Sequence, residues 1–235
     1  MRPNVITYAT VINAWARSGE VDAPQKAESV LRRIDQLYQE GDDGVKPDVY
    51  TFTSVIDALG RKGTVESAER AMEVLQTMEE RYRDTGDEDV RPDVRTHTSA
   101  IIAVSRSGTD PQTAEDILDR LEETADAGGT RIDTDCYNSM IQAWEYSNEP
   151  GKAVHAWAVY RRMVDRCGAG VSTVQPDIVG LNSVLGACSF TDVQSEVDRK
   201  DALRIANKAF KFVTASKPKY GQPDHIVFST MLMVL

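Results

Sequence analysis

The sequence predicts an all-α protein, an α-solenoid of stacked antiparallel helix pairs. Three observations lead to this fold. A short motif recurs six times along the 235 residues, at intervals of 40 to 47 residues. Each recurrence opens a segment whose apolar residues have the spacing of one helical face, and in the complete repeats a second such segment follows. No segment alternates polar and apolar residues for long, so we expect no sheet.

The recurring motif is a turn that ends in Asn or Asp. The closing residues are Asn4, Asp48, Asp93, Asp133, Asp177 and Asp224. We therefore expect a single repeat array over residues 1–235, with complete repeats at 5–48, 49–93, 94–133, 134–177 and 178–224 and a partial repeat at 225–235. The chain begins with the last residues of one repeat and stops inside another, so we expect it to be a segment of a longer array.

The first helix of each repeat starts directly after the closing residue. Counted from there, residues four, seven, eight and eleven form one apolar face, as in Phe52, Val55, Ile56 and Leu59. Residue ten is alanine in every complete repeat: Ala14, Ala58, Ala103, Ala143 and Ala187. A residue this small lets a second helix approach closely.

The second helix shows the same periodicity when the repeats are aligned on an alanine near its start. These alanines are Ala27, Ala68, Ala114, Ala153 and Ala202, and the residues three, four and seven positions later are apolar or amphipathic. One helix pair cannot bury both apolar faces by itself, whereas stacked pairs can. Long, polar, Gly-rich loops such as "YRDTGDEDVRPD" separate the repeats.

Composition excludes several classes of protein. The net charge of -10 argues against bulk attraction to nucleic acid, although acidic residues are expected to concentrate in the second helices and loops. Cys136, Cys167 and Cys188 form no CxxC pair, which favours free thiols over a zinc site. No apolar run approaches the ~18 residues that span a membrane, and the N-terminus has no signal or transit pattern.

No catalytic or cofactor motif is present, so we expect no enzyme activity, no cofactor and no metal. A phosphate-binding loop, a nucleophile elbow and an HExxH helix are all missing. His97 takes the aromatic place of a core face, which favours packing. The acidic stretch "DTGDED" lacks the spacing of a calcium loop, which favours a solvated loop.

The repeat resembles the pentatricopeptide repeat. The resemblance is carried by openings such as "PDVYTFTSVIDALGRKG" and by the Ala-rich second helix, and it covers the chain from Pro3 to Leu235. The family's repeats are shorter than these, and the surplus lies in the loops. The resemblance implies a right-handed superhelix with first helices on its concave side. It also implies sequence-specific binding of single-stranded RNA, one base per repeat, in organelle RNA processing, stability or translation, in a mitochondrion or plastid.

Within the family, the fifth residue of the first helix and the closing residue of the repeat read the base. The resemblance assigns these roles to Ala9/Asp48, Thr53/Asp93, Thr98/Asp133, Asn138/Asp177 and Asn182/Asp224, with Ser229 in the partial repeat. It implies that Thr/Asp pairs prefer G and Asn/Asp pairs prefer U, so repeats two to five should read GGUU. The alternative is that the aspartates only cap helix starts.

Two further sets of residues are expected to contact RNA. The second residue of each repeat should flank the base, and these residues are Ile6, Tyr50, Arg95, Val179 and Ile226, whereas Asp135 of repeat four cannot stack well. Three arginines at one register position, Arg17, Arg61 and Arg106, should form a basic ladder for phosphates. The alternative for them is a solvated helix end, where a cation complements the helix dipole.

Two classes of function remain open. Polar fifth residues favour an RNA-binding module. The acidic balance and the acidic loops favour a helical scaffold for protein–protein interaction.

Overall fold

The computed structural model describes residues 3–126, 131–171, 173–189 and 195–215, together with 225, 228, 229 and 231. The chain divides into two compact units, residues 1–109 and residues 110–235. Ten α-helices and two short 3₁₀ helices account for the regular structure of the described residues, which contain no strand.

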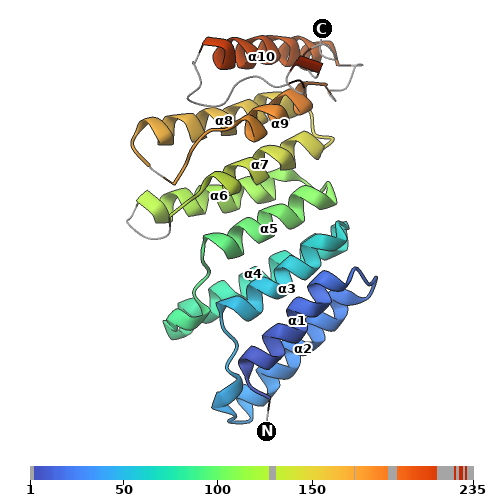
Figure 1. Ribbon diagram of the computed structural model, residues 1–235, viewed down its shortest axis with the longest axis vertical. Helices are drawn as coiled ribbons and strands as arrows, with labels where there is room; N and C mark the ends of the chain where they lie inside the picture. Colours follow the sequence, from blue (N-terminus) through green and yellow to red (C-terminus); the bar gives the residue numbers. More distant parts are fainter. Residues whose placement is uncertain are drawn as a thin grey trace. The chain divides into compact units, whose positions relative to one another are not determined.

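The unit 1–109 holds five helices in two layers. They are α1 (Val5–Ser18), α2 (Ala23–Gln39), α3 (Val49–Lys62), α4 (Val65–Thr85) and α5 (Val94–Ser107). In Figure 1, α1, α3 and α5 follow one another as the layer of first helices, and α2 and α4 pack beside them. Contacts of α3 with α1, α2, α4 and α5 place it at the centre of this unit.

The unit 110–235 repeats this arrangement. Its helices are α6 (Pro111–Asp126), α7 (Thr134–Tyr146), α8 (Lys152–Gly168), α9 (Ile178–Ser189) and α10 (Glu196–Ala215). The first helices α7 and α9 contact each other, and each contacts the second helices on either side of it (Figure 1). The predicted fold class, an α-solenoid of stacked helix pairs, is therefore confirmed.

Local sequence fixes where the first helices begin and end. Each begins at the closing residue of the preceding repeat, whose side chain accepts a hydrogen bond from the backbone N–H three residues later; for Asp48 and Thr51 the distance is 2.8 Å. Three of them, α1, α3 and α5, end at Gly19, Gly63 and Gly108, which have φ angles of 73°, 64° and 66°. Glycine adopts this left-handed conformation without strain, which stops the helix.

The apolar faces predicted from the sequence form most of the core, although Val11 on the predicted face of α1 is exposed. Phe52, Val55 and Ile56 of α3 are fully buried, as are Leu118 of α6 and Ala156 of α8. The alanines at the tenth place are buried in α3, α5, α7 and α9, whereas Ala14 of α1 is exposed.

One of these alanines lies at a contact between successive first helices. We expected the small residue to admit the paired second helix, which stays a prediction, and Ala103 of α5 lies against Gly60 of α3. A Cβ atom on Gly60 would lie 3.2 Å from the Cβ of Ala103. Successive first helices therefore approach closely at this position.

The long loops between the repeats of unit 1–109 contain regular turns and fixed side-chain contacts. Each of the first two contains a 3₁₀ turn, Asp43–Val45 or Glu88–Val90, whose valine is 1% exposed. Lys46 of the first loop pairs with Asp87 and Asp89 of the second, at 2.7 and 2.9 Å. Apolar anchors and cross-loop ion pairs thus hold these loops against the helices.

Candidate nucleic-acid interface

The predicted base-reading side chains line one register position of the first helices. Thr53, Thr98 and Asn138 are buried, at 5%, 9% and 7% exposure, and Ala9 is buried as well. Asn182 is half-buried, and Ser229 is exposed. Asp224, the closing residue of repeat five, and Ile226 lie outside the described residues.

Repeat four brings its two predicted reading residues into direct contact. The Nδ2 atom of Asn138 lies 3.2 Å from both carboxylate oxygens of Asp177. Because a carboxylate only accepts hydrogen bonds, the amide nitrogen must face it, and this fixes the orientation of the amide. Asp177 also accepts from the backbone N–H of Gly180 at 3.0 Å, so this residue caps α9 and holds Asn138 at once.

Repeat two joins its reading residues through a third side chain. The Oγ1 atom of Thr53 lies 2.8 Å from Oγ1 of Thr96, which in turn donates to Oδ1 of Asp93 at 2.9 Å. Thr53 also donates to the backbone carbonyl of Val49 at 2.7 Å. Thr96 is the third residue of the following repeat and was not singled out in the sequence.

The structure gives fewer contacts for the other predicted reading pairs. Ala9 offers Asp48 no hydrogen-bonding side chain. Thr98 lies in unit 1–109 and Asp133 in unit 110–235. Asp133 accepts from the N–H of Cys136 at 2.9 Å and thereby caps α7.

Three buried polar atoms stand out at this position. Among the described residues, the buried side-chain atoms without a hydrogen-bond partner are Oγ1 of Thr98, Oδ1 of Asn138 and Oδ1 of Asn182. All three belong to fifth residues. Buried polar atoms are nearly always paired in folded proteins, so each exception calls for an explanation, such as a ligand or water.

The capping role of the closing residues is real and does not exclude a reading role. Asp48, Asp93, Asp133 and Asp177 all accept from the backbone through Oδ1. The Asn138 contact reaches both oxygens of Asp177, so capping leaves this carboxylate able to bind a second group.

The second residues of the repeats, as far as the structure describes them, are exposed, as a base-flanking role requires. Ile6, Tyr50 and Val179 are 69%, 45% and 46% exposed. In unit 1–109, two of these residues are held by the ninth residue of the preceding repeat. Asn13 donates to the Tyr50 hydroxyl at 3.0 Å, and Asp57 lies 3.8 Å from the Arg95 guanidinium. Asp135 is also exposed.

The three arginines of the predicted basic ladder lie in the last turns of α1, α3 and α5. Arg17, Arg61 and Arg106 are exposed, and none forms an ion pair with the described residues. The backbone carbonyl of Arg106 would lie 3.3 Å from a Cβ on Gly63, so this arginine follows closely on the C-terminal end of α3. All three are free to bind anions.

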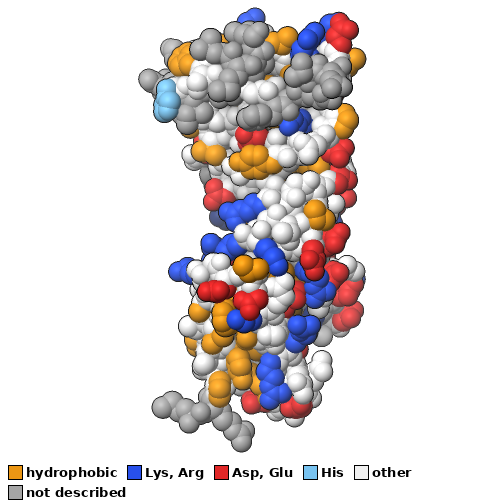
Figure 2. All heavy atoms as spheres, turned by 90° about the vertical axis from the view of Figure 1, so that its right-hand side faces the viewer, with side chains coloured by type: hydrophobic (Ala, Val, Ile, Leu, Met, Phe, Trp, Pro, Cys, Tyr) orange, Lys and Arg blue, Asp and Glu red, His pale blue; other side chains and the backbone are white. Residues whose placement is uncertain are grey.

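The acidic charge is distributed less simply than we expected from the sequence. Among the second helices, α4 and α6 are acidic, whereas α2, α8 and α10 carry a net positive charge. Much of the negative charge lies in the connecting segments. Figure 2 shows a face on which blue basic and red acidic side chains are interspersed, with the red ones denser towards its right-hand edge. Strong bulk attraction of RNA is not expected from such a surface.

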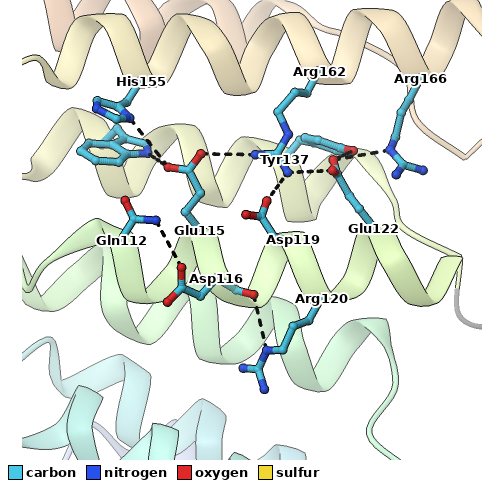
Figure 3. Close-up of polar contacts among 11 residues, drawn as sticks. Gln112, Glu115, Asp116, Asp119, Arg120, Glu122, Tyr137, His155, Arg162 and Arg166 are labelled. Atoms are coloured by element: carbon cyan, nitrogen blue, oxygen red, sulfur yellow. Dashed lines mark hydrogen bonds and ion pairs between the residues drawn. The ribbon is translucent and has the colours of Figure 1, made fainter. Parts of the chain in front are cut away.

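A charged network joins the second helices α6 and α8 (Figure 3). Arg162 of α8 pairs with Glu115 at 3.2 Å, with Glu122 at 2.7 Å, and with Asp119. Glu122 also accepts from the hydroxyl of Tyr137 on α7. Burial and this carboxylate raise the pKa of Tyr137, which keeps the hydroxyl protonated as a donor. The acidic face of α6 is therefore neutralised by α8, and we assign it a structural role.

No described group suggests chemistry or a metal. No cluster of His, Cys, Asp and Glu side chains in the described ranges could hold a metal ion. Burial raises the pKa of the Cys188 thiol to about 12, which leaves it unreactive. His97 is largely buried and bonds the backbone carbonyl of Asp93 at 2.8 Å, as a packing residue does. No helix within the described part is both long enough and apolar enough to cross a membrane.

Comparison with known proteins tests the resemblance found in the sequence. Residues 43–79 match the family model described as "PPR repeat". This segment is similar to a pentatricopeptide repeat. The resemblance of this segment to the family is thus confirmed, and solved pentatricopeptide repeat structures share the fold of the chain as a whole.

Two crystal structures show the likeness in fold. One is the pentatricopeptide repeat protein PPR10 in complex with an 18-nt psaJ RNA element; identity is 21%, the TM-score is 0.60, and the match covers 99% of this chain and 28% of that one. The other is PPR10 from maize, with 18% identity, a TM-score of 0.53 and coverage of 99% and 32%. This chain therefore spans about a third or less of these proteins. No curated protein matched the sequence.

Sequence reasoning missed the third residues of the repeats. Thr96 and Gly180 lie directly beside the fifth residue of the preceding repeat. The signal was present in the aligned repeats, where the third residues are Thr7, Thr51, Thr96, Cys136 and Gly180. In that alignment, the glycine at position 180 is the one residue that indicates a special role, because a Cβ atom has no room there.

Proposed function

We propose that this chain binds single-stranded RNA and reads one base with each repeat. The observation that carries the proposal is the set of unpaired polar atoms on Thr98, Asn138 and Asn182, which recur at the reading position of successive repeats. Orphaned polar atoms at one register position are costly to the fold unless a ligand uses this position. Single-stranded RNA suits it because repeat proteins of this kind read one base per helical repeat.

The proposed base sequence for repeats two to five is GGUU. The pairs Thr53/Asp93 and Thr98/Asp133 would read the guanines, and Asn138/Asp177 and Asn182/Asp224 the uracils. The exposed side chains of Tyr50, Arg95 and Val179 would lie against base faces, as aromatic, guanidinium and aliphatic groups do in RNA complexes. Arg17, Arg61 and Arg106 would contact phosphates.

The RNA-bound PPR10 structure supports the proposal, because PPR10 shares the fold over nearly the whole of this chain. Few phosphate contacts are expected, since only three arginines form the ladder, so affinity should depend mainly on base contacts and fall only moderately with salt. We propose a binding function without catalysis, acting in RNA processing, stability or translation in a mitochondrion or plastid.

A helical scaffold for protein partners is the alternative, and the acidic loops are its main support. Two of the acidic residues in these loops, Asp87 and Asp89, are already paired with Lys46, which leaves less charge for a partner. The geometry therefore favours RNA.

Fluorescence anisotropy with labelled oligonucleotides tests the proposal. The chain should bind an oligo(A) RNA that carries GGUU more tightly than one that carries UUGG, by about tenfold, since a good base contact contributes ~1–3 kcal/mol of discrimination by analogy with DNA readout. A single-stranded DNA and a duplex RNA of the same sequence serve as controls. Equal binding of all four oligonucleotides, or binding of none, would favour the scaffold.

A further inference from the structure

We propose that the third residue of the following repeat helps to determine which base a repeat selects, as a positioning residue for the fifth side chain. The inference rests on the proposed RNA-binding function and adds to it a residue that touches no base. It concerns Thr96, which lies beside Thr53, and Gly180, which lies beside Asn138.

The hydrogens at Thr53 and Thr96 can be assigned from the acceptors around them. Each hydroxyl carries one proton. The carboxylate of Asp93 only accepts, so the Thr96 proton points to it across 2.9 Å. The two hydroxyl oxygens lie 2.8 Å apart, so the Thr53 hydroxyl must be the donor in this contact. The same Thr53 proton also points to the backbone carbonyl of Val49.

This arrangement sets the chemical character of Thr53 towards a ligand. Its only proton is used inside the protein, so the hydroxyl offers a base only lone pairs. A base edge with hydrogen-bond donors suits such a group, and guanine carries N2–H₂ as well as N1–H donors on its pairing edge. Thr96 thereby favours guanine at repeat two without contacting it.

In repeat four, Gly180 acts by leaving space for the side chain of Asn138. A Cβ atom at this position would lie 2.5 Å from Oδ1 of Asn138, and 3.3 Å from side-chain atoms of Ile141 and Tyr160. Any larger third residue would push the amide away from Asp177. The glycine thus permits the direct contact between Asn138 and Asp177 in repeat four. In repeat two, Thr96 instead bridges Thr53 and Asp93.

The repeats supply a matched control for Thr96. Thr51 is also a fully buried third residue, and its hydroxyl donates to the capping Asp48 at 2.6 Å. The fifth residue before it is Ala9, which has no hydroxyl to bridge. Thr51→Val and Thr96→Val therefore remove the same side-chain hydrogen bond to a capping aspartate and keep the backbone cap, and only Thr96→Val removes a bridge to a reading side chain.

The experiment measures base preference at the position read by repeat two. Anisotropy compares the full chain on four RNAs with G, A, U or C there. We expect Thr96→Val to reduce the preference for G by about tenfold, Thr51→Val to leave it unchanged, and Thr96→Ser, which keeps the hydroxyl, to restore it. Equal preferences in the wild type and Thr96→Val, or equal losses in the two valine variants, would overturn the inference. A wild type without any preference would instead overturn the proposed function.

Gly180→Ala gives a second readout that needs no RNA. The side-chain amide protons of Asn138, followed by NMR, should be shifted by the Asp177 carboxylate in the wild type and move towards free asparagine values in the variant. Gly168→Ala is the control, since a Cβ there meets no atom within 4 Å. An unchanged Asn138 signal in Gly180→Ala would contradict the positioning role.

Discussion

Single residues in this chain combine two tasks that sequence patterns treat separately. The closing aspartates cap the first helices, and Asp177 in addition holds the amide of Asn138. The residue that caps the helix is therefore also the residue predicted to read the base. The sequence could identify the aspartates as candidates for both tasks, but only the geometry of Asn138 shows that the two are compatible.

Packing at the alanine of the tenth place gives a prediction for one residue. Ala103→Leu should lower the free energy of unfolding by ~1–3 kcal/mol, because Ala103 is 1% exposed and lies against Gly60 of the neighbouring helix. Ala14→Leu places the same change on the exposed face of α1 and should alter stability by less than about 0.5 kcal/mol. Urea denaturation checks both, and equal midpoints for the two variants would refute the packing assignment.

A partly buried carboxyl group gives a prediction about pH. Glu145 of α7 lies near Lys152, whose Nζ donates to the backbone carbonyls of Glu145 and Ser147 at 3.2 and 3.0 Å. Burial raises the pKa of Glu145 and lowers the pKa of Lys152. Because the folded state binds the Glu145 proton more tightly than the unfolded state, this group adds stability as the pH falls through its raised pKa towards 4.5.

Glu145→Gln tests that sign, since glutamine stays neutral. The thermal midpoint of the wild type, measured relative to this variant, should rise as the pH is lowered from 7.5 to 5. The comparison removes the contribution of the other carboxylates, which titrate in both proteins. A difference that is constant over this range, or that falls, would show that folding does not raise the pKa of this carboxyl group.

At the level of the helices, the sequence predicted the fold well because the signals are local. Periodic apolar residues, the capping aspartates and the glycines after α1, α3 and α5 all act within a few residues of the element they define. The 3₁₀ turns at Asp43–Val45 and Glu88–Val90 were missed, since each depends on one valine that is buried by tertiary packing. The Arg162 network was missed for a similar reason, because its partners lie more than one helix away in sequence.

This network yields a prediction about contacts between second helices. Arg162→Ala should destabilise the chain by about 1–3 kcal/mol, because it leaves Glu115, Asp119 and Glu122 together without their shared cation. The adjacent Arg161 has a side chain that is 51% exposed and, among the described residues, pairs only with Asp165 at 3.8 Å. Arg161→Ala is therefore the control, with an expected loss below about 0.5 kcal/mol. Similar denaturation midpoints for the two variants would contradict the role given to the network.

For the whole molecule, the proposed reading of RNA depends on the register of the repeats along the chain. Residues of the same type recur at the fifth and closing positions, so the candidate site could be predicted from the sequence by aligning the repeats. The third residues could not, since their effect depends on how closely neighbouring first helices approach. The handedness of the superhelix and the identity of its concave side stay predictions of the resemblance.

The most direct test of the account is to exchange the reading residues. The double variant Thr53→Asn, Thr98→Asn converts repeats two and three to the Asn/Asp type, and binding to RNAs that carry GGUU and UUUU is then compared with the wild type. The account predicts that the wild type prefers GGUU and that the double variant shifts towards UUUU by tenfold or more, since each base contact contributes ~1–3 kcal/mol of discrimination. Equal binding of both RNAs by the wild type, or an unchanged preference in the variant, would contradict it.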